Sequence, residues 1–397
     1  MRQKGEPIIT SLLDTDKYKF SMQQVNLHQY PRATARYRFK LRDKDIDLTP
    51  IAAEVKDQLA MVAELRFQED ELRYLSEEPH LSAGYIDFLS DFTLDTKHIQ
   101  LETSGGNLNI YTEGSMLKGG PWELYVLPIV SEVWYRHTIP EPNYEEGRRR
   151  LSEKISLLKS QGDMPGFNFA DFGSRRRFSK AWQAEVIRTL RLNLSEYFVG
   201  TSNYHFAMEQ GLIPVGTMAH EYLQAWQGLV HPLDAQKAAL DAWAQEFRGC
   251  LGDALTDVIG MDSFCDLLDL YLAKQFDGFR HDSGCPELWC EKLIQRLHAL
   301  KVDPKTKRAI WSDGLSIPGM VELYRQFQDK IQVGFGIGTN LTNDLGYRPL
   351  NIVMKLTEVN GRPVAKLSDS PGKIMCEDPD YVAWLANSYG RKAEFVC

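Results

Sequence analysis

Residues 310–340 hold two apolar runs joined by a helical segment, and this pattern decides the fold. The runs IWSDG (310–314) and VGFGIGTN (333–340) each contain a polar, glycine-bearing turn. Between them lies GMVELYRQFQDK (319–330), in which apolar residues recur at helical spacing. A strand, a helix and a strand in succession predict two parallel strands connected by a helical crossover.

Five earlier turns of the same kind extend this pattern back to about residue 165. They are FADFGS (169–174), FVGTSN (198–203), PVGTMAHE (214–221), LTDVIGMDS (255–263) and FRHDSG (279–284). Seven strand ends predict an irregular (β/α) barrel of seven or eight units, with its site at the carboxyl ends of the strands. The alternative is an open doubly wound sheet, but no GxGxxG turn follows an early strand here.

The two ends of the chain depart from this pattern. TARYRFKLR (34–42) alternates apolar with basic residues, as in a half-buried strand with one basic face. NIVMKLTEVNGRPVAKLS (351–368) is typical of a β-hairpin that turns at Asn360 and Gly361. Both segments are expected to belong to a smaller antiparallel domain beside the barrel.

The predicted domain organisation follows from these patterns. Residues 1–125 form an N-terminal α+β domain, within which residues 51–92 are expected to be helical. Residues 126–345 form the barrel-like domain, and residues 346–397 return to pack with the N-terminal domain. The fold class is therefore α/β, with a smaller α+β domain formed from both ends of the chain.

The composition is that of a globular protein with a substantial core, 43% hydrophobic and 25% charged. Its net charge of -8 argues against bulk binding of nucleic acid, so an anionic ligand needs a local basic pocket. The most apolar stretch, LYVLPIVSEVWY (124–135), is too short to span a bilayer and contains Glu132. No apolar signal segment is visible near the N-terminus. These features predict a cytoplasmic protein without a membrane or nucleic-acid partner.

Cysteine spacing supports the same compartment. None of the six cysteines forms a CxxC pair, so we expect free thiols in a reducing environment. They are Cys250, Cys265, Cys285, Cys290, Cys376 and Cys397.

His220 in GTMAHEY (216–222) is the first candidate for chemistry. A zinc-protease helix needs a second histidine four residues on, and Gln224 stands there instead. Two interpretations remain open from the residues alone. His220 is either a structural histidine held by a hydrogen bond, or a neutral imidazole that accepts a phosphoryl group near pH 7.

Glycines follow the last apolar run, in VGFGIGTN. Gly336 and Gly338 would let backbone N–H groups approach a phosphate, and Thr339 would add a hydroxyl. The alternative is a turn that requires a positive φ. The residues alone favour neither interpretation.

FRHDSGC places Arg280, Asp282, Ser283 and Gly284 at another strand end. A carboxylate beside small groups suits a ribose diol or a hydrated Mg²⁺. Alternatively, the aspartate only caps the following helix, which Pro286 would begin.

DFGSRRRFS carries an arginine triplet, 175–177, shortly after Phe172. Arginine binds carboxylate or phosphate through two parallel hydrogen bonds and stacks on rings. A basic triplet is usually a solvated face, but its place at a strand end favours a role in the site.

In this order the motifs resemble those of the nicotinate phosphoribosyltransferases, of the bacterial, ATP-coupled type. The resemblance runs nearly end to end and rests on several independent motifs. They are SLLDTDKYKFSMQQ (11–24), FADFGSRRRFS (169–179), GTSNYHFA (200–207), PVGTMAHEY (214–222), RHDSG (280–284), SDG (312–314), GFGIGTNL (334–341), LNIVMKL (350–356) and VAKLSDSPGK (364–373).

The resemblance implies that nicotinate and 5-phosphoribosyl 1-pyrophosphate give nicotinate mononucleotide and pyrophosphate, as in NAD salvage. ATP hydrolysis would be coupled to this reaction through phosphorylation of His220, and Mg²⁺ would accompany the substrates. It also implies a homodimer with shared active sites at the subunit interface. The expected partners are thus small molecules and a second copy of the chain.

The resemblance assigns roles at the pyridine end of the site. Phe172 would stack on one face of nicotinate, and Tyr18 of a neighbouring subunit would cover the other. Arg175 would bind the carboxylate, with Ser202 or Asn203 nearby. Related nicotinamide enzymes carry an acidic residue in place of Ser202, so a serine there favours a carboxylate substrate.

The resemblance also implies a ribose and phosphate end. There Asp282 and Asp313 would bind Mg²⁺ through the substrate's pyrophosphate. The other residues assigned to this end are Arg42, Arg280, Ser283, Gly284, Gly336, Gly338 and Thr339, with some of Lys355, Lys366 and Lys373.

One position departs from the family pattern, because Cys285 stands where an Asp or Asn usually follows the DSG. A thiol is a poor partner for Mg²⁺ or a hydroxyl, which would weaken metal or ribose binding. If the position only caps a helix, cysteine costs about 1 kcal/mol relative to Asp. Two alternative functions stay open: a nicotinamide- or quinolinate-using enzyme on the same scaffold, and a non-catalytic binding relative.

Overall fold

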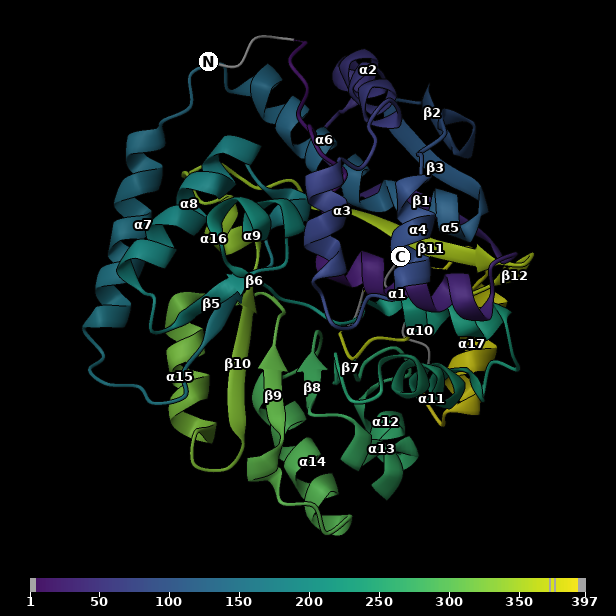
Figure 1. Ribbon diagram of the computed structural model, residues 1–397, viewed down its shortest axis with the longest axis vertical. Helices are drawn as coiled ribbons and strands as arrows, with labels where there is room; N and C mark the ends of the chain where they lie inside the picture. The colour runs from purple at the N-terminus through teal and green to yellow at the C-terminus, as the bar shows by residue number, and fades with distance from the viewer. Residues whose placement is uncertain (1–4, 371–372, 375, 392–397) are drawn as a thin grey trace.

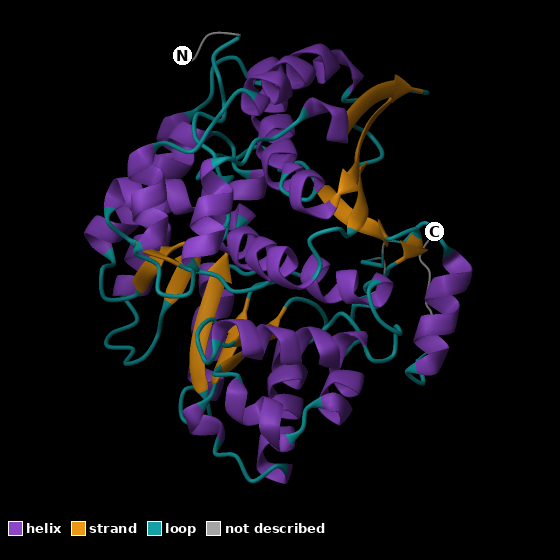
Figure 2. Ribbon diagram, turned by 45° about the vertical axis from the view of Figure 1, so that its right-hand side comes forward, coloured by secondary structure: helices purple, strands orange, loops and turns teal. Residues whose placement is uncertain are grey.

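A computed structural model describes residues 5–370, 373–374 and 376–391. Its strands form one parallel sheet and one antiparallel sheet, which lie side by side (Figures 1 and 2). The predicted α/β class, with a barrel-like domain beside a smaller antiparallel one, is confirmed. Cys397 lies outside the described residues, and the other five cysteines are free thiols, as expected.

The seven predicted strand ends belong to one parallel sheet, in the order β6-β5-β4-β10-β9-β8-β7. Its strands are β4 (Phe169–Asp171), β5 (Phe198–Thr201), β6 (Ile213–Pro214), β7 (Asp253–Leu255), β8 (Gly278–His281), β9 (Arg308–Trp311) and β10 (Gln332–Ile337). The strands β6 and β7 end the series and do not pair, so the barrel is open between them.

Helix α1 (Lys17–Gln29) begins at the β6 edge of this sheet. The Lys17 backbone N–H donates to the Ser202 carbonyl at 2.7 Å, and its Nζ donates to the Pro214 carbonyl at 3.2 Å. In a closed barrel, another strand would pair with the backbone groups at this edge. Here the N-terminal helix satisfies some of them. This contact brings the DTDKY segment (14–18) to the strand ends.

Helices occupy the connections between the parallel strands, as the sequence predicts. In α14 (Pro286–Ala299) the stripe of Trp289, Leu293 and Leu297 is buried. The other connecting helices are α8 (Lys180–Asn193), α9 (Tyr204–Gln210), α10 (His220–Ala225), α11 (Ala235–Phe247), α12 (Met261–Leu267), α13 (Leu270–Gln275) and α15 (Ile317–Phe327), with α7 (Tyr144–Lys159) before β4 and α16 (Thr339–Thr342) after β10.

The connection between β7 and β8 contains two helices where the sequence pattern alone indicates one. Residues 263–276 look like a single amphipathic helix, but the structure divides them between α12 and α13. The side chain of Asp269 accepts a hydrogen bond from the Leu272 N–H at 2.8 Å and caps a new helix. A cap of this kind competes with continuation of the preceding helix.

The second sheet joins both ends of the chain in the order β12-β11-β1-β3-β2. Its strands are β1 (Thr34–Leu41), β2 (Ile99–Ser104), β3 (Asn107–Ser115), β11 (Ile352–Val359) and β12 (Arg362–Pro363). The predicted hairpin is confirmed, since Asn360 and Gly361 turn between β11 and β12 with φ of 51° and 73°. This left-handed pair is the geometry that Asn-Gly favours.

Residues 51–92 are helical, as expected, and supply α2 (Ala52–Ala63), α3 (Glu69–Ser76) and α4 (Ala83–Ser90). The remaining helices are α5 (Met116–Gly119), α6 (Trp122–Thr138) and α17 (Pro379–Ser388). No helix among the described residues is both long and apolar enough to cross a membrane.

Helix α6 connects the two halves of the molecule. Its Leu124 and Tyr135 pack in the core of the barrel, whereas Trp122 and Tyr125 pack in the core below the antiparallel sheet. The expected boundary between residues 125 and 126 therefore falls inside one helix that both cores share.

Candidate active site

A cavity of about 460 Å³ lies where the carboxyl ends of the parallel strands face β11 and the start of α1. Most residues that the motifs assign to substrate contribute to its wall. They are Tyr18, Arg42, Phe172, Arg175, Ser202, His220, Arg280, Asp282, Asp313, Gly338 and Thr339, together with Lys355, Lys366 and Lys373. The site therefore depends on residues that are more than 300 positions apart in the chain.

Four assigned residues do not line the cavity. The Asn203 side chain is fully buried and donates to Asp14 at 2.8 Å. Ser283 Oγ donates to Asp257 at 2.5 Å, and the Gly284 N–H donates to Ser370. These contacts hold the loops that carry the cavity residues.

Gly336, the fourth, lies behind Phe172. A Cβ at this position would come within 2.4 Å of the Phe172 ring. The absence of a side chain at Gly336 therefore lets the ring lie against β10. The glycine supports the aromatic wall of the cavity and does not face a phosphate there.

The cavity is basic although the protein as a whole is acidic. Its wall contains seven cationic side chains against four carboxylates. The cations are Arg42, Arg175, Arg176, Arg280, Lys355, Lys366 and Lys373, and the carboxylates are Asp16, Glu123, Asp282 and Asp313. This local excess of positive charge is the basic pocket that an anionic ligand requires in a chain of net charge -8.

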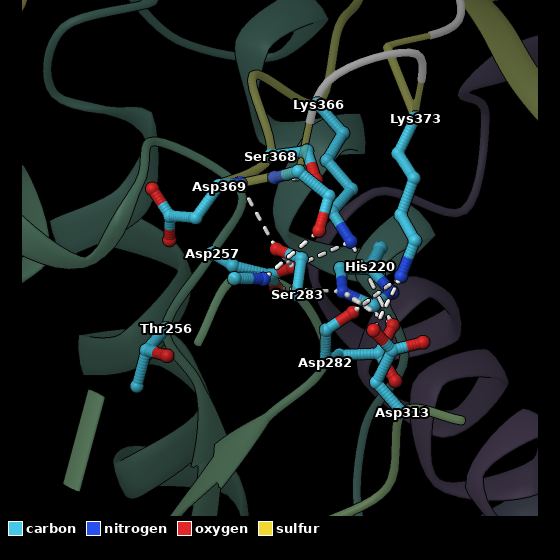
Figure 3. Close-up of polar contacts among 12 residues, drawn as sticks. His220, Thr256, Asp257, Asp282, Ser283, Asp313, Lys366, Ser368, Asp369 and Lys373 are labelled. Atoms are coloured by element: carbon cyan, nitrogen blue, oxygen red, sulfur yellow. Dashed lines mark hydrogen bonds and ion pairs between the residues drawn. The ribbon is translucent and has the colours of Figure 1, made fainter. Parts of the chain in front are cut away.

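His220 begins α10 at the edge of this cavity (Figure 3). Its Nε2 lies 2.8 Å from Asp257 Oδ1 and 3.5 Å from Asp282 Oδ2. Burial, reinforced by the positive charge of Lys366, lowers the pKa of His220 to about 4. The imidazole is thus neutral near pH 7. His220 is held by a hydrogen bond and also faces the cavity.

Asp257 is the main site residue that the sequence motifs missed. It is almost fully buried, and its Oδ2 lies 2.6 Å from Lys366 Nζ (Figure 3). Burial opposes its ionisation, yet Lys366 and His220 hold the pKa of Asp257 well below its usual range. A signal was present, because Asp257 lies in LTDVIGMDS, one of the seven strand-end turns.

The end of the cavity near Phe172 and Arg175 contains a carboxylate to which the sequence prediction gave no role. Ser202 Oγ donates to Asp16 Oδ1 at 2.6 Å, and Asp16 Oδ2 lies 3.6 Å from Arg175 Nε. The sequence prediction weighed only the side chain at position 202, and the structure places the negative charge of a carboxylate beside that serine. Asp16 supplies that charge from another segment, and Arg175 offsets it.

The three arginines of the triplet have different roles. Arg175 and Arg176 line the cavity, whereas Arg177 is fully buried. The Arg177 guanidinium forms a bidentate pair with Asp14, at 2.7 and 2.9 Å. This pair fixes the DTDKY segment to the loop after β4.

As a consequence, the chain's own Tyr18 reaches the cavity that Phe172 lines. The Arg175 guanidinium lies 5.8 Å from the centroid of the Tyr18 ring. The resemblance gave this place to a tyrosine of a neighbouring subunit, and the geometry corrects that expectation. Both aromatic walls come from one chain, because Asp14 and Lys17 fasten α1 to the barrel.

Asp282 and Asp313 lie at the ends of the adjacent strands β8 and β9. Asp282 Oδ1 accepts from Ser312 Oγ at 3.0 Å. Asp313 Oδ2 pairs with Lys373 Nζ at 2.6 Å, as Figure 3 shows. Two carboxylates facing one basic cavity fit the hard oxygen donors through which Mg²⁺ binds beside substrate phosphates.

Cys285 lies outside this cavity wall, at the N-cap position of α14. Its Sγ is exposed and donates to Glu287 Oε2 at 3.1 Å. The geometry favours the helix-capping interpretation of this position, so the cysteine does not alter the cavity directly.

A basic cavity at the strand ends of an open α/β barrel, walled by a second sheet, defines an enzyme site for a small anionic substrate. The model of the nicotinate phosphoribosyltransferase (NAPRTase) family matches residues 167–393, and the model of its N-terminal domain matches residues 13–131. The chain belongs to this family of phosphoribosyltransferase enzymes.

Similar proteins agree with this assignment. Nicotinate phosphoribosyltransferase of Cupriavidus necator is 49% identical over 386 residues, or 96% of this chain and 98% of that protein. The crystal structure of nicotinate phosphoribosyltransferase from Vibrio cholerae superposes with a TM-score of 0.94, at 38% identity, covering 97% of this chain and 94% of that one. The corresponding structure from Porphyromonas gingivalis gives a TM-score of 0.92 at 34% identity, covering 96% and 100%.

Proposed function

We propose that this chain makes nicotinate mononucleotide and pyrophosphate from nicotinate and 5-phosphoribosyl 1-pyrophosphate, and couples this reaction to ATP hydrolysis through His220. The observation that carries the proposal is one basic cavity that contains Arg175, two aromatic side chains and a neutral histidine. Membership of the NAPRTase family supports the same reaction.

Nicotinate would occupy the end of the cavity near Tyr18 and Phe172. Their rings suit a flat aromatic substrate, and the Arg175 guanidinium suits its carboxylate. Arg175 would exchange part of its attraction to Asp16 for the stronger hydrogen bonds of the incoming carboxylate.

The phosphoribosyl donor would occupy the other end. Arg280 and Asp282 would bind the ribose, while Gly338 and Thr339 would approach the 5′-phosphate. Arg42 and the cavity lysines would neutralise pyrophosphate, and burial with the positive charge of Lys366 lowers the pKa of Lys355 to about 8. Mg²⁺ bound to the donor would be held by Asp282 and Asp313, where it would neutralise charge on the leaving group.

Transfer requires little acid–base chemistry from the protein. The lone pair of the pyridine nitrogen forms a bond to C1 of the ribose as the bond from C1 to the pyrophosphate oxygen breaks. Pyrophosphate leaves with that electron pair, and the ring becomes a pyridinium cation. The protein supplies alignment and a fixed positive field around the leaving group.

For ATP coupling we propose that Nδ1 of His220 is the nucleophile. Asp257 accepts a hydrogen bond from the Nε2–H group, so the proton stays on Nε2 and Nδ1 has a free lone pair. No described residue forms a hydrogen bond with Nδ1. Nδ1 attacks the γ-phosphorus, the bond to the bridging oxygen breaks, and ADP leaves. Water later breaks the P–N bond and releases phosphate. The phosphoryl charge would order neighbouring basic groups while it is present.

A specific observation also supports a second candidate substrate. Asp16 lies beside Ser202 at the pyridine end, and a carboxylate there could accept the amide N–H of nicotinamide. Incubation with 5-phosphoribosyl 1-pyrophosphate, Mg²⁺ and equal nicotinate and nicotinamide, with and without ATP, decides between them. Nicotinate mononucleotide as the main product supports the proposal, whereas a nicotinamide product overturns it.

The domain division at residues 125 and 345, and assembly as a homodimer in a reducing compartment, remain predictions of the sequence. Free thiols at the five described cysteines support the compartment. Because the chain's own Tyr18 lines the cavity, we propose that each site is built from one chain, whatever its oligomeric state.

A further inference from the structure

Three buried charged residues form a cluster between α1, α6 and α10. Lys19, Glu123 and Glu221 are each less than a tenth exposed. Lys19 Nζ donates to Glu123 Oε2 at 3.1 Å and also to Glu221 Oε1. One ammonium group is therefore shared by two carboxylates that come from different helices.

The helices that carry the cluster also carry residues of the proposed chemistry. Glu221 directly follows His220 in the first turn of α10, and Lys19 directly follows Tyr18 in α1. Glu123 lies in the first turn of α6 and lines the cavity. The shared lysine thus joins the helix that begins at His220 to the helix that carries Glu123 at the cavity wall.

The charges of the cluster do not balance. Burial raises the pKa of Glu221 to about 7, although Lys19 acts in the opposite direction. Its Oε2 is buried and has no hydrogen-bond partner in the described part of the chain. Glu123 behaves differently, because Lys19 and Arg175 outweigh its burial and lower its pKa.

Several charged or titratable groups face these two carboxylates. Lys19 faces both from α1, and Tyr37 faces Glu221 from β1. Arg175 and Lys355, from the loop after β4 and from β11, attract Glu123. The positive charge on Arg175 is thus divided between Glu123, Asp16 and any substrate carboxylate.

We propose that Glu221 is a positioning residue that couples the phosphorylation of His220 to the affinity for nicotinate, through Lys19 and Glu123. This inference rests on the proposed ATP coupling. A phosphoryl group on His220 places negative charge beside Glu221 and favours its protonation by a proton from solvent. Lys19 then neutralises Glu123 alone, and Arg175 becomes free to bind the substrate carboxylate. Loss of phosphate returns the proton to solvent and reverses the change.

The test measures KM for nicotinate with and without ATP, in the parent and in Glu221→Gln. In the parent we expect ATP to lower KM by about 5- to 150-fold, the usual range for coupled sites. The glutamine imitates the protonated carboxyl, so KM without ATP should already be low. The ratio of the two KM values should then fall to within about twofold of one. A residue with only a structural role would instead raise KM in both conditions.

Two further variants complete the design. Glu123→Gln removes the same surplus charge at the cavity end and should also lower KM without ATP. Glu78→Gln is the matched control, because Glu78 pairs with Lys17, another buried lysine of α1, at 2.9 Å outside the cavity. It should respond to ATP as the parent does.

The outcomes separate the inference from the function on which it rests. Phosphohistidine at His220, followed by mass spectrometry, is measured in every variant. If the parent forms phosphohistidine and Glu221→Gln keeps the full ATP response, this inference alone is overturned. If the parent forms none and its KM ignores ATP, both are overturned.

Discussion

Nε2 of His220 lies 2.8 Å from Oδ1 of Asp257, and this contact sets which ring nitrogen carries the proton. The carboxylate can only accept, so Nε2 is the protonated nitrogen and Nδ1 has the free lone pair. Lys366, paired with the other oxygen of Asp257, keeps that carboxylate ionised. The protein thereby prepares a neutral imidazole of defined orientation beside a basic cavity.

The tautomer predicts the effect of Asp257→Asn. An asparagine amide can donate to Nε2, which would move the proton to Nδ1 and block the proposed nucleophile. We expect the rate of His220 phosphorylation by ATP to fall by about 100-fold or more, as when a catalytic histidine is held in the wrong tautomer. Rapid-quench detection of phosphohistidine measures this rate. An unchanged rate would show that Nδ1 is not the phosphoryl acceptor.

The lowered pKa of His220 predicts the acid limit of phosphorylation. Since the pKa of His220 in the folded protein is about 4, its neutral form persists until the pH falls through that value. An unperturbed histidine would already lose its neutral form near pH 6.5. In Lys366→Met, the negative charges of Asp257 and Asp282 are no longer opposed by the lysine, so the pKa of His220 should rise. The acid limb of the phosphorylation rate should then move to higher pH. The rate of His220 phosphorylation by ATP, measured from pH 4 to 8 without the other substrates, tests both statements.

The support of Phe172 by Gly336 predicts a selective loss of nicotinate binding. In Gly336→Ala the new Cβ would lie 2.4 Å from the ring, which must move. We expect KM for nicotinate to rise about tenfold, equivalent to about 1.4 kcal/mol, with little change for the phosphoribosyl donor. Gly334→Ala is the control, because its Cβ would lie 3.3 Å from Asn168 Oδ1 and 3.6 Å from Ile310 Cγ1 and would not approach the Phe172 ring. Equal effects of both substitutions would contradict the proposed role.

The Asp14–Arg177 pair predicts a large effect on stability. Both side chains are fully buried, so Asp14→Ala leaves an uncompensated guanidinium in the core. We expect the free energy of unfolding to fall by about 3–5 kcal/mol in urea denaturation. Asp45→Ala removes a largely exposed partner of Arg348 and should leave the unfolding midpoint unchanged.

The position of Tyr18 predicts the result of mixing two inactive variants. Tyr18→Ala and Phe172→Ala each damage the aromatic wall of a site that one chain builds. Unfolded and refolded together, they should show no more activity than the two separate proteins. If subunits shared their sites, mixed dimers would recover about a quarter of the parental activity.

Much of the fold follows from local patterns. The seven turns between residues 169 and 340 all lie at the ends of parallel strands, because short buried strands and amphipathic helices have distinct periodicities. The hairpin at Asn360 and Gly361 follows from the one turn geometry that this pair favours. The break at Asp269 was missed, since one capping side chain interrupts an otherwise continuous helical pattern.

The candidate site was predictable only in part. Motifs identified Phe172, Arg175 and His220, because strand ends of a parallel sheet converge on one edge. Only the family resemblance selected Arg175 from the triplet, and the pattern of the residues did not separate it from Arg177, although one faces the cavity and the other is buried against Asp14. The three arginines are consecutive, so their spacing does not show which of them pairs with a residue far away in the sequence.

The sequence by itself determined the order of strands and helices, the basic and aromatic character of the strand ends, and a histidine among them. Only the tertiary structure decided that Asp257 orients His220, that Asp16 faces Arg175, and that Lys19 joins Glu221 to Glu123. Secondary structure depends on neighbours within a few residues, which the sequence displays directly. Charge pairing depends on distances between residues that can be more than 300 positions apart, and folding alone sets those distances.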